Sequence, residues 1–223
     1  MIIDLHIHTY HSFDSLMKPD KIVKTAKSVG LTGIAVSDHN TIQGGLECKR
    51  VNKDDNFLVI VGAEISTEVG DIIGLFLHKE ILSRKFTDVV EEIQSQSGLV
   101  LLSHPFKGHK LDEIDFNKID LIEGYNSRLH PRENQKAIEL AEGKNIPIVA
   151  GSDAHFYSEI GNCRTIYRSK NLLHPIKTVY RRNIFYTEIL SQFLKAKKNN
   201  DVKLFVKLLK WTPKYVFRRL VEK

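Results

Sequence analysis

The chain has 223 residues, of which 42% are hydrophobic, as expected for one substantial globular domain with a small appendage. No apolar run is long enough to span a membrane, and the start lacks the basic and apolar regions of a signal peptide, so we expect neither feature. The two cysteines, Cys48 and Cys163, are too few for a disulfide framework or a cysteine-based zinc site. These properties favour a reduced, cytoplasmic protein.

The net charge of +6 is distributed unevenly along the chain. From Lys170 onward there are 14 Lys and Arg residues but only 3 Asp and Glu residues, which leaves 19 basic and 24 acidic residues before that point. The sequence therefore predicts a mildly acidic body followed by a strongly basic tail. Divalent cations bound to the body would offset its negative charge locally.

The predicted elements alternate between apolar, strand-like runs and helical segments. In chain order they are strand 2–5, helix 19–29, strand 33–36, helix 41–51, strands 57–61, 65–68 and 72–77, helix 86–96, strands 99–102 and 121–122, helix 131–143 and strand 146–150. Gly70-Asp71 resembles the turn of a hairpin between two of these strands. The alternation indicates an α/β fold with a largely parallel sheet, and about seven strands favour a barrel over an open sheet.

Potential metal ligands follow several of the predicted strands. His6 and His8 are two residues apart, so in a strand their side chains would point to the same face. Histidines and carboxylates also end later strands, and such mixed shells suit catalytic Zn²⁺, Mn²⁺ or Fe²⁺ better than a structural zinc site. We therefore expect a multi-metal site where the carboxyl ends of the strands converge.

These segments resemble the polymerase-and-histidinol-phosphatase (PHP) family of metal-dependent phosphoesterases, in the family's order, from residue 1 to about residue 165. The motifs are Asp4-Leu5-His6-Ile7-His8-Thr9 followed by Ser12 and Asp14, Ser37-Asp38-His39-Asn40-Thr41, Gly62-Ala63-Glu64-Ile65-Ser66-Thr67, Ser103-His104-Pro105-Phe106 and Gly151-Ser152-Asp153-Ala154-His155. The resemblance implies a distorted (βα)7 barrel, to which we assign residues 1–183, and the pattern of residues 184–223 predicts a basic helical C-terminal extension.

The resemblance also implies two or three divalent ions (Mn, Zn or Fe) and a set of ligands. These ligands are His6, His8, Asp14, His39, Glu64, Asp71, His104, Asp153 and His155. Glu64 would bridge two metals, and Asp38 could orient an imidazole from outside the ligand set. Asp71 stands where the family often has histidine, so a simple turn aspartate is the alternative there. His11 is a rival to Asp14 in the same loop.

The function implied is hydrolysis of a small-molecule phosphomonoester by a hydroxide that bridges two metals. Glu64, Asp153 and His155 are the candidate catalytic residues, and Lys107, Arg128 and Arg164 are candidates for binding the substrate phosphate. The alternatives are a PHP-type nuclease acting on nucleic-acid ends and a non-catalytic PHP scaffold.

The basic tail has an amphipathic pattern. Val202, Phe205, Val206 and Leu209 fall on one helical face, beside a stripe formed by Lys203, Lys207, Lys210 and Lys214. Three interpretations remain open: a helix packed on the barrel, contact with an anionic membrane surface, and contact with nucleic acid. Membrane contact would place a cytoplasmic protein peripherally at the membrane.

Overall fold

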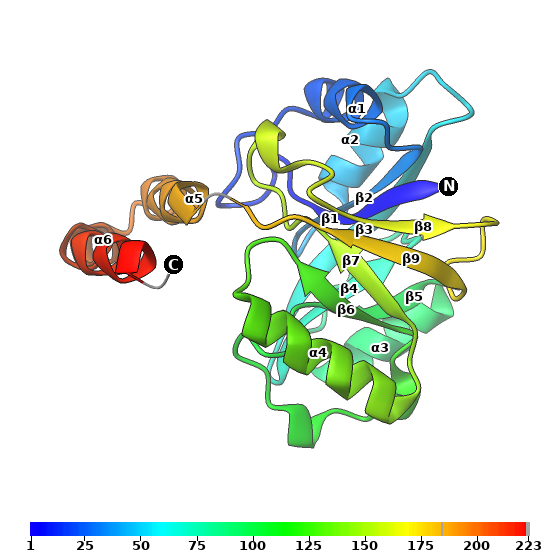
Figure 1. Ribbon diagram of the computed structural model, residues 1–223. Coiled ribbons are helices and arrows are strands. Elements are labelled where there is room, and N and C mark those ends of the chain that lie inside the picture. The colour runs from blue at the N-terminus through cyan, green and yellow to red at the C-terminus, as the bar shows by residue number, and fades with distance from the viewer. Residues whose placement is uncertain (184, 222–223) are drawn as a thin grey trace.

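The computed structural model describes residues 1–183 and 185–221 (Figure 1). Nine strands form one sheet in the order β7-β6-β5-β4-β3-β2-β1-β8-β9. The strands are β1 (Ile2–Ile7), β2 (Gly33–His39), β3 (Leu58–Thr67), β4 (Gly70–Leu75), β5 (Leu99–Leu102), β6 (Leu121–Asn126), β7 (Ile148–Gly151), β8 (Cys163–Tyr167) and β9 (Pro175–Tyr180). The α/β class expected from the sequence is confirmed.

The sheet curls until it nearly closes into a barrel. Residues that follow β7 return to β1, where Ala154 forms a parallel bridge with Ile7. The amide of His8 donates to the carbonyl of Ala154 at 2.9 Å, and the amide of Ala154 donates to the carbonyl of His6 at 3.2 Å. This contact brings the motifs at the two ends of the barrel sequence side by side.

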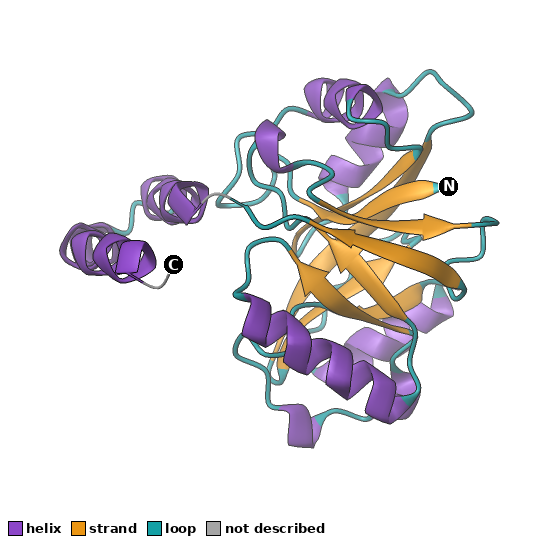
Figure 2. Cartoon of the chain, in the orientation of Figure 1, coloured by secondary structure: helices purple, strands orange, loops and turns teal. Residues whose placement is uncertain are grey.

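Helices cover the outside of the barrel (Figure 2). They are α1 (Pro19–Ser28), α2 (Gln43–Val51), α3 (Phe86–Ser95) and α4 (Pro131–Lys144), with short 3₁₀ turns η1 (Leu111–Glu113), η2 (Phe116–Lys118) and η3 (Tyr157–Glu159). Two further helices, α5 (Phe185–Lys198) and α6 (Val202–Val221), stand outside the barrel. No helix in the described part of the chain is both long and apolar enough to cross a membrane.

The interior of the barrel is apolar in its middle and polar at the carboxyl ends of the parallel strands. Ile60, Leu101, Leu121 and Val149 belong to one buried apolar cluster. Because side chains on one face of a strand recur every second residue, Glu64 lies on the same face of β3 as Ile60 and further along the strand. Polar side chains such as Glu64 therefore point into the barrel beyond this apolar cluster, at the carboxyl ends of the strands.

The strand pattern differs from the expectation in several places. β4 runs antiparallel to both of its neighbours, and β8 runs antiparallel to both β1 and β9, so the sheet is mixed rather than largely parallel. The predicted strands 57–61 and 65–68 are one continuous strand, β3. Gly62 lies within this strand and does not interrupt it. Glycine is required there because β4 passes close by, and a Cβ would lie 2.6 Å from the carbonyl of Gly74. The expected hairpin is present, but its turn falls at residues 68–69, just before Gly70.

A candidate metal centre at the carboxyl ends of the strands

The side chains predicted to bind metal converge at the carboxyl ends of the strands. In each of four groups, the potential ligand atoms all lie within 4.8 Å of one another. The groups are His8, Asp14, His39 and His155; His6, His8 and Glu64; His6, His104 and Asp153; and Glu64, Asp71 and His104. Every ligand predicted from the sequence belongs to at least one group. Their proximity is a structural finding, and their role as ligands stays a prediction.

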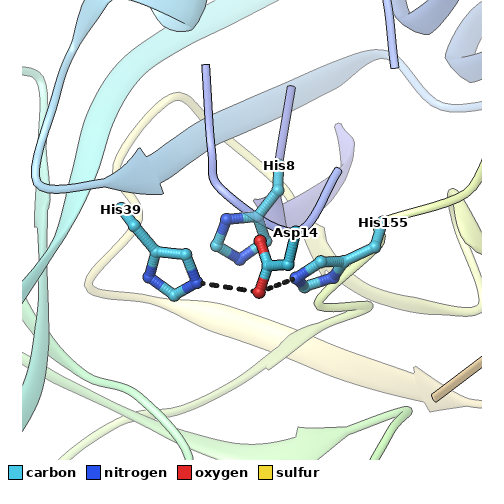
Figure 3. Close-up of side chains that lie close together, drawn as sticks. All are labelled: His8, Asp14, His39 and His155. Carbon is cyan, nitrogen blue, oxygen red and sulfur yellow. Dashed lines mark hydrogen bonds and ion pairs between the residues drawn. The ribbon is translucent and has the colours of Figure 1, made fainter. Parts of the chain in front are cut away.

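Asp14 is the centre of the first group (Figure 3). Its Oδ2 lies 3.3 Å from Nε2 of His39 and 3.1 Å from Nε2 of His155. Nδ1 of His155 lies 2.8 Å from the carbonyl oxygen of Asp153, which can only accept a hydrogen bond. In neutral His155 the proton is therefore on Nδ1, and a nitrogen lone pair faces the Asp14 carboxylate. A proton on Nε2 or a metal ion beside it makes this arrangement favourable.

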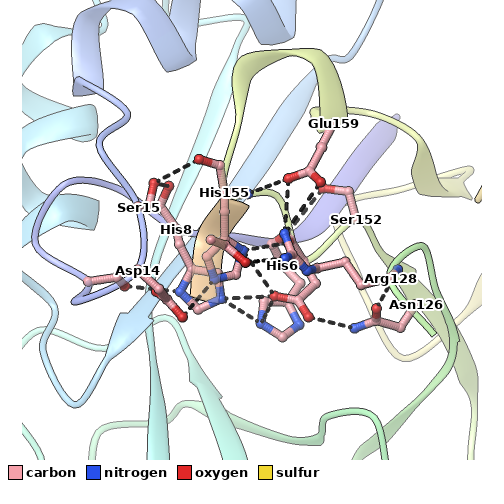
Figure 4. Close-up of polar contacts among 12 residues, drawn as sticks. His6, His8, Asp14, Ser15, Asn126, Arg128, Ser152, His155 and Glu159 are labelled. Atoms are coloured by element: carbon pink, nitrogen blue, oxygen red, sulfur yellow. Dashed lines mark hydrogen bonds and ion pairs between the residues drawn. The ribbon is translucent and has the colours of Figure 1, made fainter. Parts of the chain in front are cut away.

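His6 and His8 show the same feature more clearly, since their Nε2 atoms are 3.0 Å apart (Figure 4). Nδ1 of His6 is 3.0 Å from a carboxylate oxygen of Glu123, so it carries a proton. Nδ1 of His8 is 3.0 Å from Oγ of Ser12. The Ser12 hydroxyl donates its own proton to Asp38 at 2.8 Å and must accept from His8.

Both neutral imidazoles thus direct the lone pairs of Nε2 at the same point. Two facing lone pairs repel each other unless a proton or a metal ion lies between or beside them. Some buried polar atoms of the predicted ligands lack a hydrogen-bond partner, among them Oδ1 of Asp14 and Nδ1 of His104. The donor set, its tautomers and its unsatisfied atoms fit divalent metal ions.

Glu64 links the groups. Its Oε1 lies 2.8 Å from Nε2 of His104, and its Oε2 lies 3.1 Å from Nδ1 of His39 and 3.5 Å from Nε2 of His6. Oγ of Ser103 lies 3.2 Å from Oε1. This central position suits the bridging role expected of Glu64.

Electrostatics in the site follow from burial and close charges. Burial alone would lower the pKa of His6, but the carboxylates of Glu123, Glu64 and Asp153 raise it well above its ordinary value. Burial would raise the pKa of Glu64, but neighbouring imidazoles, led by His6, hold it well below its ordinary value. Burial lowers the pKa of His8 to about 3, so this imidazole is neutral at pH 7. In the metal-free protein, a proton on His6 occupies the place that a metal ion would take.

The backbone at two of the site residues is in an uncommon conformation. His104 has a φ of 26° and Asp153 has a φ of 51°, in the positive region that non-glycine residues rarely adopt. Gly151 lies beside them, where a Cβ would meet Oε1 of Glu123 at 2.3 Å and Cβ of His6 at 2.4 Å. The fold accepts local strain and close backbone approach to bring these side chains together.

The structure places Asp71 within the candidate site and His11 outside it. The Asp71 carboxylate is within reach of Glu64 and His104, so the site can include it although it follows a turn. Its carbonyl also accepts from Ser103 at 3.0 Å. His11 lies instead near Glu47, at 3.5 Å, and is not a member of the group that contains Asp14.

Sequence reasoning missed Glu123, which is 1% exposed. One carboxylate oxygen faces Nδ1 of His6, and the other accepts from the His104 amide and from Nδ2 of Asn126, both at 2.9 Å. A signal was available, because Glu123 directly follows the two apolar residues that begin β6. Asp38 accepts from Ser12, which in turn lies beside Nδ1 of His8, so its contacts are compatible with the expected orienting role.

The three candidate phosphate-binding residues occupy different places. Lys107 lies at the rim, with Nζ 3.8 Å from Oδ2 of Asp153 and about half of its side chain exposed. Arg128 is buried and already paired, 3.2 Å from Glu159 and hydrogen-bonded to Ser191 (Figure 4). Arg164 is not brought to the site.

The reason lies in the alternation of β8. Its buried face carries Cys163, Thr165 and Tyr167, so Arg164 points away from the barrel interior. The expectation that Arg164 binds phosphate does not fit this placement, and we do not assign it that role.

Comparisons with known proteins agree with this architecture. A family model described as PHP-associated matches residues 131–176. Two uncharacterized proteins of Methanocaldococcus jannaschii are similar in sequence. One is 37% identical over 145 residues (56% of this chain and 84% of the relative), and the other is 31% identical over 212 residues (89% and 84%).

A similar solved structure is a two-domain protein from Bacteroides vulgatus that contains a predicted PHP-like metal-dependent phosphoesterase. The two share 19% identity with a TM-score of 0.64, over 77% of this chain and 60% of that chain. The present chain thus spans less than two thirds of that protein, and the likeness at this identity concerns the fold. The nearly closed barrel, the convergent histidines and carboxylates, and these similarities together show that the chain belongs to the PHP domain family.

Proposed function

We propose that the chain is a metal-dependent hydrolase that cleaves phosphomonoesters of small molecules. The observation that carries this proposal is the pair of Nε2 atoms of His6 and His8, 3.0 Å apart and both directed at the site. The PHP family and the phosphoesterase description of the similar Bacteroides vulgatus protein support the choice of a phosphate ester. The proposed ligands are the residues of the four groups, holding two or three Mn, Zn or Fe ions.

Divalent ions held there would lower the pKa of bound water toward neutrality and polarise a phosphoryl oxygen. The residues of the chain contribute fixed charge and proton transfer. Neighbouring imidazoles hold the pKa values of Glu64 and Asp153 well below their ordinary range, against the effect of burial, so both carboxylates are ionised at pH 7. Lys107, exposed at the rim, supplies positive charge for a substrate phosphate.

Proton transfer to the leaving group falls to His155 in this proposal, because the ionised Asp153 carboxylate has no proton to donate. The two are 3.5 Å apart at the Asp14 side of the site. A cysteine nucleophile is not supported, because Cys48 and Cys163 are both buried and burial raises the pKa of both thiols.

A nuclease is the second candidate, and one observation favours it. Lys195 and Lys198 of the basic tail lie beside the loop that carries Asp14, near the mouth of the site. A substrate panel separates the two candidates from each other and from a scaffold without activity.

The panel contains small phosphomonoesters, nucleotides and short oligonucleotides, assayed for phosphate release with added Mn²⁺ and after chelation. We expect release from small phosphomonoesters, its loss on chelation, and its loss in His104→Ala. The control is His78→Ala, because His78 is an exposed loop histidine away from the site. Preferential release from oligonucleotides would favour the nuclease, and no release from a metal-loaded protein would favour a scaffold. Release that survives chelation would contradict the proposal.

A further inference from the structure

The C-terminal helix α6 exposes an apolar stripe that no other described segment of the chain covers. Val202, Val206 and Leu209 recur at the i, i+4, i+7 spacing of one helical face and are 72%, 44% and 55% exposed. The helix packs on α5 through the adjoining face, where Leu208 is 6% exposed, while Phe205 at the edge of the stripe meets the ring of Phe193. The exposed stripe is therefore additional to the contact with α5.

Four lysines run alongside this stripe. Lys203, Lys207, Lys210 and Lys214 recur at i, i+4, i+7 and i+11 and are all exposed. Residues 202–216 contain no acidic residue that could neutralise them. One surface of α6 thus combines apolar side chains with an uncompensated row of positive charge.

The pair of helices α5 and α6 lies beside the barrel, at the carboxyl ends of its parallel strands (Figure 1). Nζ of Lys198 on α5 donates to the carbonyls of Tyr10, Ser12 and Ser15 at 2.7, 2.6 and 2.9 Å. Lys195 lies 4.5 Å from the centre of the Phe13 ring in the same loop. α5 therefore holds the pair beside the loop that carries Asp14, and α6 lies on the far side of α5.

From these observations we propose that the exposed face of α6 docks the protein on an anionic lipid surface. The apolar stripe enters the boundary between headgroups and acyl chains, while the lysine stems extend so that their ammonium groups meet anionic headgroups. The mouth of the barrel then lies close to the membrane. This proposal is independent of the hydrolase activity.

Other occupants fit this face less well. A second copy in a symmetric contact would bring two lysine rows together, and like charges would oppose the contact. Nucleic acid would pair with the lysines but leave the apolar stripe in water. A lipid surface is the partner that satisfies both the stripe and the charge.

The test is flotation of the full chain with vesicles of neutral phosphatidylcholine, with or without about a third anionic phosphatidylserine. We expect binding only to the anionic vesicles, and weaker binding as salt increases. Replacing Lys203, Lys207, Lys210 and Lys214 by Gln should lower the partition coefficient roughly a hundredfold or more, since each lysine contributes about a factor of five. Val206→Ser with Leu209→Ser should also reduce binding.

A matched control removes the same number of charges from exposed lysines elsewhere, by Lys24→Gln, Lys49→Gln, Lys79→Gln and Lys170→Gln. Circular dichroism establishes that each variant is folded. The proposal is overturned if the wild-type chain does not bind anionic vesicles, or if the control loses as much binding as the α6 variant. It is also overturned if the chain forms dimers in solution that Val206→Ser with Leu209→Ser dissociates. Because no step measures activity, a failure here leaves the proposed hydrolase untouched.

Discussion

Replacing Glu123 by Gln tests how the site prepares His6 for metal. In the wild type, one Glu123 oxygen faces Nδ1 of His6 and the other accepts from the His104 amide and from Asn126. Glutamine has the same shape but only one amide oxygen. Its oxygen will take the side with two donors, which places the NH₂ group against Nδ1 of His6.

This substitution reverses the tautomer of His6. Facing a donor, Nδ1 becomes the acceptor, and the proton moves to Nε2, which points at His8 at 3.0 Å. In neutral His6 of the variant, the nitrogen predicted to bind metal carries the proton, whereas in the neutral wild-type imidazole Nε2 has a free lone pair. Loss of such an orienting partner costs about 10- to 100-fold in metal affinity, or about 1.4 to 2.7 kcal/mol.

The assay is a competitive titration of Mn²⁺ or Zn²⁺ against a chromogenic chelator, with thermal unfolding of the metal-free variant as the measure of folding. Glu142→Gln, on the exposed surface of α4, is the matched control and should bind metal like the wild type. A folded Glu123→Gln protein that binds metal as tightly as the wild type would refute the tautomer reasoning.

Three further predictions concern the same site. Metal binding at pH 7 should release protons and strengthen as pH rises, because nearby carboxylates raise the pKa values of His6 and His39 above 6.5 against the effect of burial, whereas His8 is already neutral. Protonated His6 and His39, paired with these carboxylates, stabilise the metal-free fold below pH 6.5, and this contribution is lost as pH rises through the raised pKa values. Proton release on metal binding is measured by calorimetry in buffers of different ionisation enthalpy. The absence of proton release would contradict both statements. Gly151→Ala should destabilise the protein by about 1–3 kcal/mol, since its Cβ would overlap Glu123 and His6, and an unchanged thermal midpoint would exclude that packing. Lys198→Met should weaken metal binding severalfold by freeing the loop that carries Asp14, whereas Lys197→Met, an exposed neighbour, should not; equal affinities would show that the contact does not position the loop.

The sequence predicted much of the site because the ligands follow apolar strands. A strand buried in the barrel directs its last polar residue to the carboxyl end, so Glu64, His104 and Asp153 could be placed without knowing the strand order. Glu123 lies inside β6 after only two apolar residues, and this position does not reveal which imidazole it will meet.

The sequence predictions that the structure does not support have a common cause. Each depends on the face a residue occupies, or the partner it contacts, in the folded chain. Arg164 was judged by its distance in sequence from the Asp153 motif, whereas the alternation of β8 decides that it points outward. Arg128 was expected to be available for phosphate, but Glu159, which is 31 residues away in sequence, pairs with it. β8 and β9 themselves were missed, since they pair antiparallel at the edge of the sheet and lack long apolar runs.

The most direct test of the metal centre is an anomalous difference map from crystals of the protein soaked in Mn²⁺ or Zn²⁺. We expect peaks between His6, His8 and Glu64 and beside Asp14, where the ligand atoms already converge. Glu64→Gln crystals should lose occupancy at the first of these positions. A map from a well-soaked crystal with no peak among these residues, or with peaks only elsewhere, would contradict the account.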